Sequence, residues 1–211
     1  NVDNCFATPY LQQPGRHGAD LVVHSATKWM DGQGRVLGGI VVGKASLIEE
    51  LRFFCRHTGP AMSPFNAWVL SKSLETLSIR MERHCANAYR IAEWLEQQPG
   101  VARVYYPHLK SHPQYELAKR QMALGGGILA FDLEGGWKAG QQFLSQIQMC
   151  SLSSNLGDTR TIVTHPASTT HAKLTEAERA AVGIGPGMIR VSVGLEALED
   201  IQLDLKRGLH V

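Results

Sequence analysis

The stretch Gly18–Trp29, which reads GADLVVHSATKW, places a lysine directly after a compact apolar run. In Asp20–His24 the apolar residues stand on consecutive positions, which is typical of a strand buried on both faces of an α/β sheet. Lys28 follows this strand beside the hydroxyl residues Ser25 and Thr27. Burial at such a strand end favours the neutral, nucleophilic form of a lysine amine. Taken alone, this motif does not distinguish a reactive lysine from an ordinary loop residue.

A second residue, Asp3, gives the lysine a chemical partner. Asp3 ends an apolar strand 25 residues before Lys28. Pyridoxal phosphate (PLP) chemistry needs an amine for the covalent link, a carboxylate for the pyridine nitrogen and anchors for the phosphate. Ligands of α/β sheets bind at the carboxyl ends of the strands. An Asp and a Lys at the ends of neighbouring strands would meet opposite ends of the cofactor ring.

Composition excludes several other classes of protein. The 211 residues are 44% hydrophobic and 19% charged, so a folded core is expected. The net charge is +2 without a basic run, which argues against a nucleic-acid partner, and no apolar stretch is long enough to cross a membrane. Four cysteines stand far apart in no CxxC pair, a spacing that predicts neither a metal site nor a disulfide framework and suits a reducing cytoplasm.

The order of elements predicts an α/β fold in three parts. Residues 1–62 contain the lysine strand, residues 63–99 read as one long connecting helix, and residues 100–211 form a smaller α+β unit. The long helix begins at Ser63-Pro64, and the alternative is two helices broken near Leu77-Ser78. Other expected strands are Gly38–Gly43, Val101–Tyr106, Gly127–Asp132, Thr161–Thr164 and Met188–Val193, and other expected helices are Ala45–Thr58, Trp137–Gln146 and Ala197–Leu209.

Two of these motifs, Val2–Phe6 (VDNCF) and Gly18–Lys28, resemble the PLP segment of the Cys/Met metabolism enzymes. That family includes cystathionine γ-synthase, cystathionine γ-lyase, methionine γ-lyase and the homoserine sulfhydrylases. The likeness covers essentially the whole chain and continues, in the family's order, through Ser63–Trp68, Met81–His84, Thr164–Ser168 and Ile189–Gly194. It implies an aspartate-aminotransferase-like (fold type I) PLP enzyme, with the end of the large PLP-binding domain followed by the small C-terminal domain.

The resemblance also implies a role for each motif residue. Lys28 would link covalently to the cofactor and then move protons between substrate carbons, and Asp3 would pair with the ring nitrogen. Ser25 and Thr27 would bind the cofactor phosphate through their hydroxyls. Arg190 would bind the α-carboxylate of the amino-acid substrate, for which its planar fork of donors is suited.

The segment Asn155–Asp158 (NLGD) departs from the Ser-Leu-Gly of many family members. Asn155 can still donate to the substrate carboxylate, and together with the Asp31–Arg35 loop it resembles the O-succinylhomoserine sulfhydrylase branch. That branch implies γ-replacement on an O-acylhomoserine by sulfide or a thiol, in methionine biosynthesis. Cystathionine γ-synthase, γ-lyase and methionine γ-lyase activities stay open as alternatives. For His165 and His171, a turn-stabilising role and a substrate contact both stay open.

The chain opens without Met inside an apparent strand, so we expect it to be a truncated form of a longer protein. In the family, the aromatic residue that stacks on the cofactor and further phosphate ligands lie upstream of the Asp3 motif, and the full-length enzymes are homo-oligomers, dimers of dimers. An inactive fragment of such an enzyme is therefore a further alternative.

Overall fold

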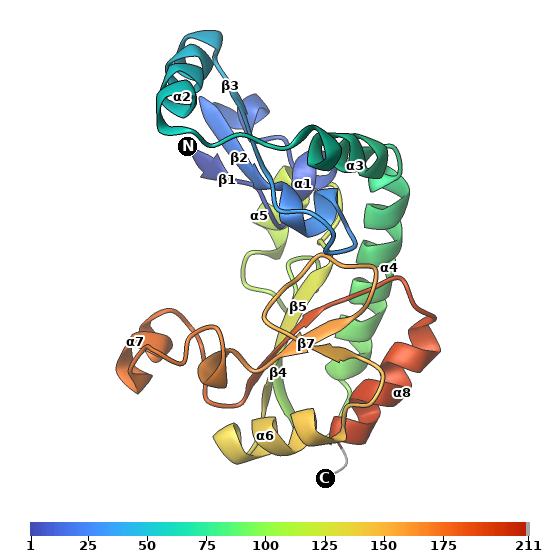
Figure 1. Ribbon diagram of the computed structural model, residues 1–211. Helices are drawn as coiled ribbons and strands as arrows, with labels where there is room; N and C mark the ends of the chain where they lie inside the picture. Colours follow the sequence, from blue (N-terminus) through green and yellow to red (C-terminus); the bar gives the residue numbers. More distant parts are fainter. Residues whose placement is uncertain (210–211) are drawn as a thin grey trace.

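The structure, a computed structural model, describes residues 1–209 and contains two β-sheets joined by helices (Figure 1). The first sheet has the order β1 (Val2–Asp3), β2 (Leu21–Ser25), β3 (Gly39–Gly43), and α2 (Ala45–Thr58) follows it. We call residues 1–62 the N-terminal lobe and residues 100–209 the C-terminal lobe. None of the helices within residues 1–209 is long and apolar enough to span a membrane.

In the N-terminal lobe, β1 runs parallel to β2, with Asp3 beside Val23, and β3 pairs antiparallel to β2. Both strands end at the same edge, so Asp3 and the segment after Ser25 lie at neighbouring carboxyl ends, as expected. The strand prediction is confirmed, but burial on both faces is wrong. β2 alternates between buried and half-buried residues, and Val41 and Val42 of β3 are exposed. Consecutive strand residues point to opposite faces, so within the described residues both faces of the edge strand β3 are largely open.

The prediction of a single long helix is wrong, and the alternative of two helices is correct. Helix α3 spans Pro64–Leu74 and helix α4 spans Leu77–Leu95. Ser63 caps α3 as predicted, because its hydroxyl accepts a hydrogen bond from the Asn66 amide. The break falls at Thr76, whose backbone leaves helical geometry (φ −110°, ψ 5°) and whose hydroxyl donates to the Ser73 carbonyl at 3.2 Å. The backbone amide of Thr76 donates to the same carbonyl at 3.3 Å, so the break forms around a local turn without any glycine or proline.

The C-terminal lobe is built on a five-stranded sheet. In spatial order the strands are β4 (Val101–Tyr105), β5 (Ile128–Leu133), β8 (Met188–Ser192), β7 (Ile162–Thr164) and β6 (Ser151–Leu152). Helices α4, α6 (Gly136–Gln146) and α8 (Leu198–Leu209) pack together around its apolar residues, with Phe131 and Phe143 at the centre of the core. Along β5 the alternate residues Ile128 and Ala130 instead line a cavity.

The sequence predicted most of these elements within one or two residues. It missed the short ones, namely α1 (Thr8–Leu11), α5 (Tyr115–Gln121), β6 and α7 (Glu176–Ala181). Short elements of this kind carry too few residues for a periodic pattern to show.

Candidate active site

Lys28 lies in a wide turn directly after β2. The turn Ala26–Met30 closes with hydrogen bonds from the Asp31 amide to the Ala26 carbonyl (2.9 Å) and from the Gly32 amide to the Lys28 carbonyl (2.8 Å). Lys28 itself has a non-helical backbone (φ −85°, ψ −126°). The chain therefore changes direction at the lysine, which is half-buried at the end of the strand.

The segment 155–158 of the C-terminal lobe packs directly on this turn. A side chain at Gly157 would place its Cβ 2.6 Å from the Trp29 amide nitrogen and 2.8 Å from the Lys28 carbonyl carbon. Gly157 also has φ +80°, which favours glycine. This close approach brings Asn155 to the lysine, and Lys28 Nζ donates to Asn155 Oδ1 at 3.1 Å.

Arg190 reaches the same segment from β8. Its Nη2 donates to the carbonyls of Ser154 (2.9 Å) and Asn155 (3.0 Å), and more weakly to the Thr164 hydroxyl (3.3 Å). Its Nε is buried and has no hydrogen-bond partner among residues 1–209. Burial lowers the pKa of Arg190 from its ordinary value. A desolvated guanidinium with an unused N–H is well suited to bind a carboxylate.

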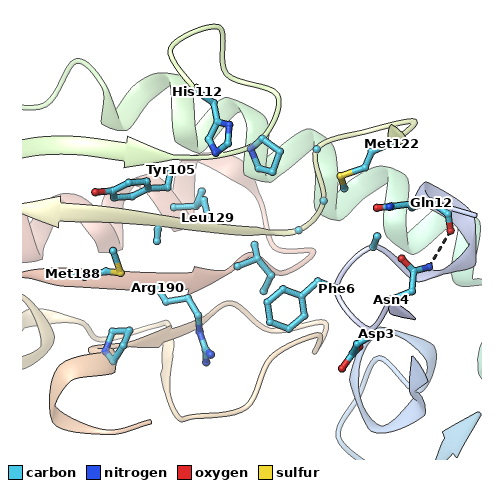
Figure 2. A pocket seen from close by; sticks show the side chains of 18 of the residues that line it. Asp3, Asn4, Phe6, Gln12, Tyr105, His112, Met122, Leu129, Met188 and Arg190 are labelled. Atoms are coloured by element: carbon cyan, nitrogen blue, oxygen red, sulfur yellow. Dashed lines mark hydrogen bonds between the residues drawn. The ribbon is translucent and has the colours of Figure 1, made fainter. Parts of the chain in front are cut away.

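Asp3 and Arg190 line one cavity of about 580 Å³ between the two lobes (Figure 2). Asp3 Oδ1 accepts a hydrogen bond from the Cys5 amide at 2.9 Å. The Cys5 thiol, and then this amide, lower the pKa of the Asp3 carboxyl, so it is ionised at neutral pH. In Figure 2 the ring of Phe6 lies between Arg190 and Asp3. The cavity thus holds a fixed anion on one lobe and a cation on the other.

Ser25 and Thr27 lie outside the lining of that cavity. The Thr27 hydroxyl accepts a hydrogen bond from the Gly38 amide at 3.1 Å and is 3.4 Å from the Gly38 carbonyl. The backbone amide of Ser25 contacts Cys5 Sγ at 2.7 Å. Phosphate binding by these two hydroxyls stays a prediction.

Sequence reasoning gave no role to three residues around the lysine: Cys5, Arg80 and Gly157. Arg80 is buried in α4, where it stands on the same face as Leu77 and His84. A charged residue within an apolar helical stripe is a detectable signal, because such a charge needs buried partners. The contacts of Cys5 and Gly157 depend on tertiary packing and leave no comparable signal.

His165 has a turn-stabilising role in the structure. Its Nδ1 lies 2.9 Å from the Ser168 hydroxyl and its Nε2 lies 2.7 Å from the Pro186 carbonyl. Both ring nitrogens are therefore engaged within the lobe. His171, in contrast, lines the cavity that contains Asp3 and Arg190.

The arrangement fits an amino-acid substrate and an aldehyde cofactor. The amine of Lys28 donates to one neutral side chain, and the buried Nε–H of Arg190, which has no partner among residues 1–209, can donate to an anionic ligand. Asp3 presents its carboxylate to the cavity that Arg190 also lines, whereas Lys28 and Asn155 lie outside the lining of that cavity. Binding of PLP by Lys28 and Asp3, and of a substrate by Arg190 and Asn155, stays a prediction.

Comparisons with known proteins identify the family of the chain. Residues 1–210 match the family described as Cys/Met metabolism PLP-dependent enzymes. The chain is 54% identical to O-succinylhomoserine sulfhydrylase of Pseudomonas aeruginosa over 208 residues, and 52% identical to L-methionine γ-lyase of Porphyromonas gingivalis over 210 residues. These alignments cover 99% of this chain but only 52% and 53% of the two relatives, so the chain spans about half their length.

A solved structure shows the same relation. Cystathionine γ-synthase of Xanthomonas oryzae pv. oryzae, in complex with aminoacrylate and cysteine, superimposes with a TM-score of 0.94 at 42% identity. The match covers 99% of this chain and 54% of that one. Relatives with three different reactions are similarly close, so the comparisons do not distinguish between those reactions.

Proposed function

The chain belongs to the family of Cys/Met metabolism PLP-dependent enzymes, and from that membership we propose that the protein replaces the γ-substituent of an O-acylhomoserine. The proposed substrates are O-succinylhomoserine and sulfide, and the product is homocysteine. The cofactor is PLP, and the expected fold class, a part of the fold type I architecture, is confirmed. The 54% identity to a sulfhydrylase and the Asn155 segment support this choice of reaction.

One observation carries the proposal: Asn155 contacts both reactive groups. Its side chain accepts a hydrogen bond from Lys28 Nζ, and its carbonyl accepts one from Arg190 Nη2. The amine that would hold the cofactor and the cation that would hold a carboxylate are therefore joined through a single residue. An α-amino acid at a PLP site needs both an amine that binds the cofactor and a group that binds its carboxylate.

The residues of the chain divide the proposed work as follows. Bound PLP supplies an electron sink that eases removal of the proton at the substrate Cα. Lys28 Nζ binds the cofactor and carries protons to and from the substrate carbons. Asp3 keeps the ring nitrogen protonated, because an ionised carboxylate beside it favours the charged form. Arg190 and Asn155 orient the substrate carboxylate, and Ser25 and Thr27 bind the cofactor phosphate.

The overall exchange balances without a redox partner. The Cγ–O bond of the ester breaks, and succinate leaves with the electron pair. Hydrosulfide forms the new Cγ–S bond. Protons taken up by Lys28 Nζ return to the substrate carbons.

γ-Elimination is the second candidate. L-Methionine γ-lyases from several bacteria are 47–52% identical to the chain, nearly as similar as the sulfhydrylase. The same residues support both reactions, because the two differ in whether a thiol is added after the γ-substituent leaves. The products separate them: homocysteine indicates replacement, and a 2-oxoacid with ammonia indicates elimination.

We also propose a division into domains. Residues 1–62 belong to a large PLP-binding domain, residues 63–99 connect it to the small domain, and residues 100–211 form the small domain. The separate sheets of the two lobes support this division.

The decisive experiment is to trap the cofactor on the protein that contains this chain. After incubation with PLP and reduction with borohydride, peptide mapping should find pyridoxyl on Lys28, and Lys28→Ala should abolish it. Lys44→Ala is the matched control, because Lys44 is exposed and pairs with Asp20. Label on Lys44 or Lys72 would contradict the assignment. Homocysteine formation from O-succinylhomoserine and sulfide then tests the reaction.

A further inference from the structure

A buried arginine, Arg80 of α4, lies against the turn that carries Lys28. Its Nη1 donates to the Trp29 carbonyl at 2.6 Å, and its Nη2 donates to the Met30 carbonyl at 3.2 Å. These are the two residues that follow Lys28 in the chain. Their carbonyls lie at the end of the wide turn, where a helical backbone leaves its acceptors without partners.

The orientation of the Arg80 guanidinium is fixed from its own helix segment. Nη2 also donates to the Ser73 carbonyl at 3.0 Å, and Nε donates to the Thr76 hydroxyl at 3.2 Å. Thr76 and Ser73 form the break between α3 and α4. The break therefore affects the site, because the Ser73 carbonyl and the Thr76 hydroxyl orient the Arg80 guanidinium toward the lysine turn.

Charged groups surround Arg80 in addition to its hydrogen-bond acceptors. Burial and the nearby cation of Arg35 lower the pKa of Arg80, while the carboxylate of Asp31 opposes this shift. Asp31 is itself buried and binds Arg35, with Nη2 at 2.9 Å from Oδ1. A buried cation with several directed hydrogen bonds is costly to loosen, because removing its partners leaves an uncompensated charge.

Gly32 leaves the room that this guanidinium occupies. A Cβ at position 32 would overlap Arg80 Nη1, and the residue has φ +74°. Gly34, two residues later, also has positive φ (+64°), but its Cβ would meet only Asp158 Oδ2 at 3.4 Å. The two glycines therefore share backbone strain and differ in contact with Arg80.

We propose that Arg80 is a positioning residue for Lys28: by holding the carbonyls of Trp29 and Met30 it fixes the backbone from which the lysine amine reaches the cofactor. The inference rests on the proposed function for the role of Lys28. α4 continues into the core of the C-terminal lobe through Ala88 and Ile91. Arg80 thus ties the lysine turn to the helix that also supports the substrate-binding lobe.

The test compares Arg80→Lys with Arg83→Lys in the protein that contains this chain. Lysine keeps the charge but cannot reach all four acceptors. Without PLP, amide hydrogen exchange at Asp31 and Gly32 should accelerate by about tenfold or more in Arg80→Lys, while exchange in the C-terminal core stays unchanged. With PLP, covalent attachment at Lys28 should slow by about tenfold, and kcat should fall with little change in KM. Arg83→Lys, on an exposed residue of the same helix, should match the parent protein.

The glycine pair tests the same contact without changing a charge. Gly32→Ala should reproduce the Arg80→Lys exchange pattern and slow attachment, and Gly34→Ala should do neither. Unchanged exchange at Asp31 and Gly32 in Arg80→Lys, uniform acceleration over the whole molecule, or equal effects of the two glycine variants would each overturn the positioning role. If the parent protein takes up no PLP at Lys28, the proposed function fails, and the exchange data still decide whether Arg80 holds the turn.

Discussion

In each lobe an amphipathic helix follows a strand, but only the helix of the C-terminal lobe buries its apolar side chains. In the C-terminal lobe, α6 follows β5 and buries Phe143 completely against Phe131. In the N-terminal lobe, α2 follows β3, yet within the described chain it buries none of its side chains and leaves Phe54 60% exposed. An amphipathic pattern therefore specifies a helix but not the surface that receives it.

The site draws on both lobes in different ways. Asp3 and Lys28 come from strand ends of the weakly packed N-terminal lobe, while Arg190 and Asn155 come from the C-terminal lobe. Arg190 lies on a central strand above a complete core, so its position is set by packing. Lys28 lies on a turn whose position depends on contacts from elsewhere, namely Asn155, Gly157 and Arg80.

The largest expected effect is on stability, and it tests the contrast between the lobes directly. Phe143→Ala should lower the free energy of unfolding by about 3–5 kcal/mol, because it leaves a cavity in the core. The same change at exposed Phe54 should alter it by less than about 0.5 kcal/mol. Equilibrium denaturation of the 211-residue chain measures both. Equal losses would show that the N-terminal lobe has a packed core of its own.

The junction between the lobes should respond to acid through His84. Its Nδ1 lies 2.7 Å from the Val193 carbonyl and its ring packs edge-on against Trp29, and burial lowers its pKa to about 4. Between pH 6.5 and about 4 the unfolded chain therefore binds a proton that the folded chain does not. Its contribution to stability is complete above pH 6.5 and falls as the pH drops through this window, by about 3 kcal/mol.

The variant His84→Asn keeps a donor for Val193 and removes the titration. The unfolding free energy of this variant should depend less steeply on pH between 6.5 and 4 than that of the parent, as measured by denaturation at a series of pH values. His17→Asn, at an exposed histidine, serves as control. An unchanged pH slope in His84→Asn would mean that the junction opens to water.

The smallest expected effects are on the kinetic constants, and they compare one variant in each lobe. Arg190→Lys should raise KM for the amino-acid substrate by at least about tenfold, roughly 1.4 kcal/mol, because lysine loses the two-point geometry. The matched change in the other lobe, Asp3→Asn, should lower kcat while PLP still attaches to Lys28. Steady-state kinetics checks both. Unchanged kinetic constants in Arg190→Lys would indicate that Asn155, and not Arg190, binds the substrate carboxylate.

The sequence predicted the fold best where local periodicity decides it. The strands β4, β5 and β8 were predicted correctly because their apolar runs are bounded by turn residues. The break at Thr76 was only an alternative, since a hydrogen bond from its own side chain produces it and no Gly or Pro marks it. Exposure was harder to predict: β2, expected to be buried on both faces, alternates between buried and half-buried residues.

For the site, motifs identified the lysine, the aspartate and the arginine, and the structure places them at the boundary of the two lobes. No local pattern could show that Asn155 joins Lys28 to Arg190, because these contacts span 127 and 35 residues of sequence. Gly157 was missed for the same reason, whereas Arg80 was missed although its charge within an apolar helical stripe is a detectable signal. Their significance lies in what they touch after folding.

The double contact of Asn155 has a consequence for how such an enzyme can diverge. A replacement at this position removes the side-chain acceptor of Lys28 Nζ directly beside the backbone carbonyl that Arg190 contacts. Mutations in residues that share a partner are not additive. A lineage that acquires a new substrate through this segment would therefore be expected to show epistasis between positions 28, 155 and 190, and engineering of the pocket would have to vary the three positions together.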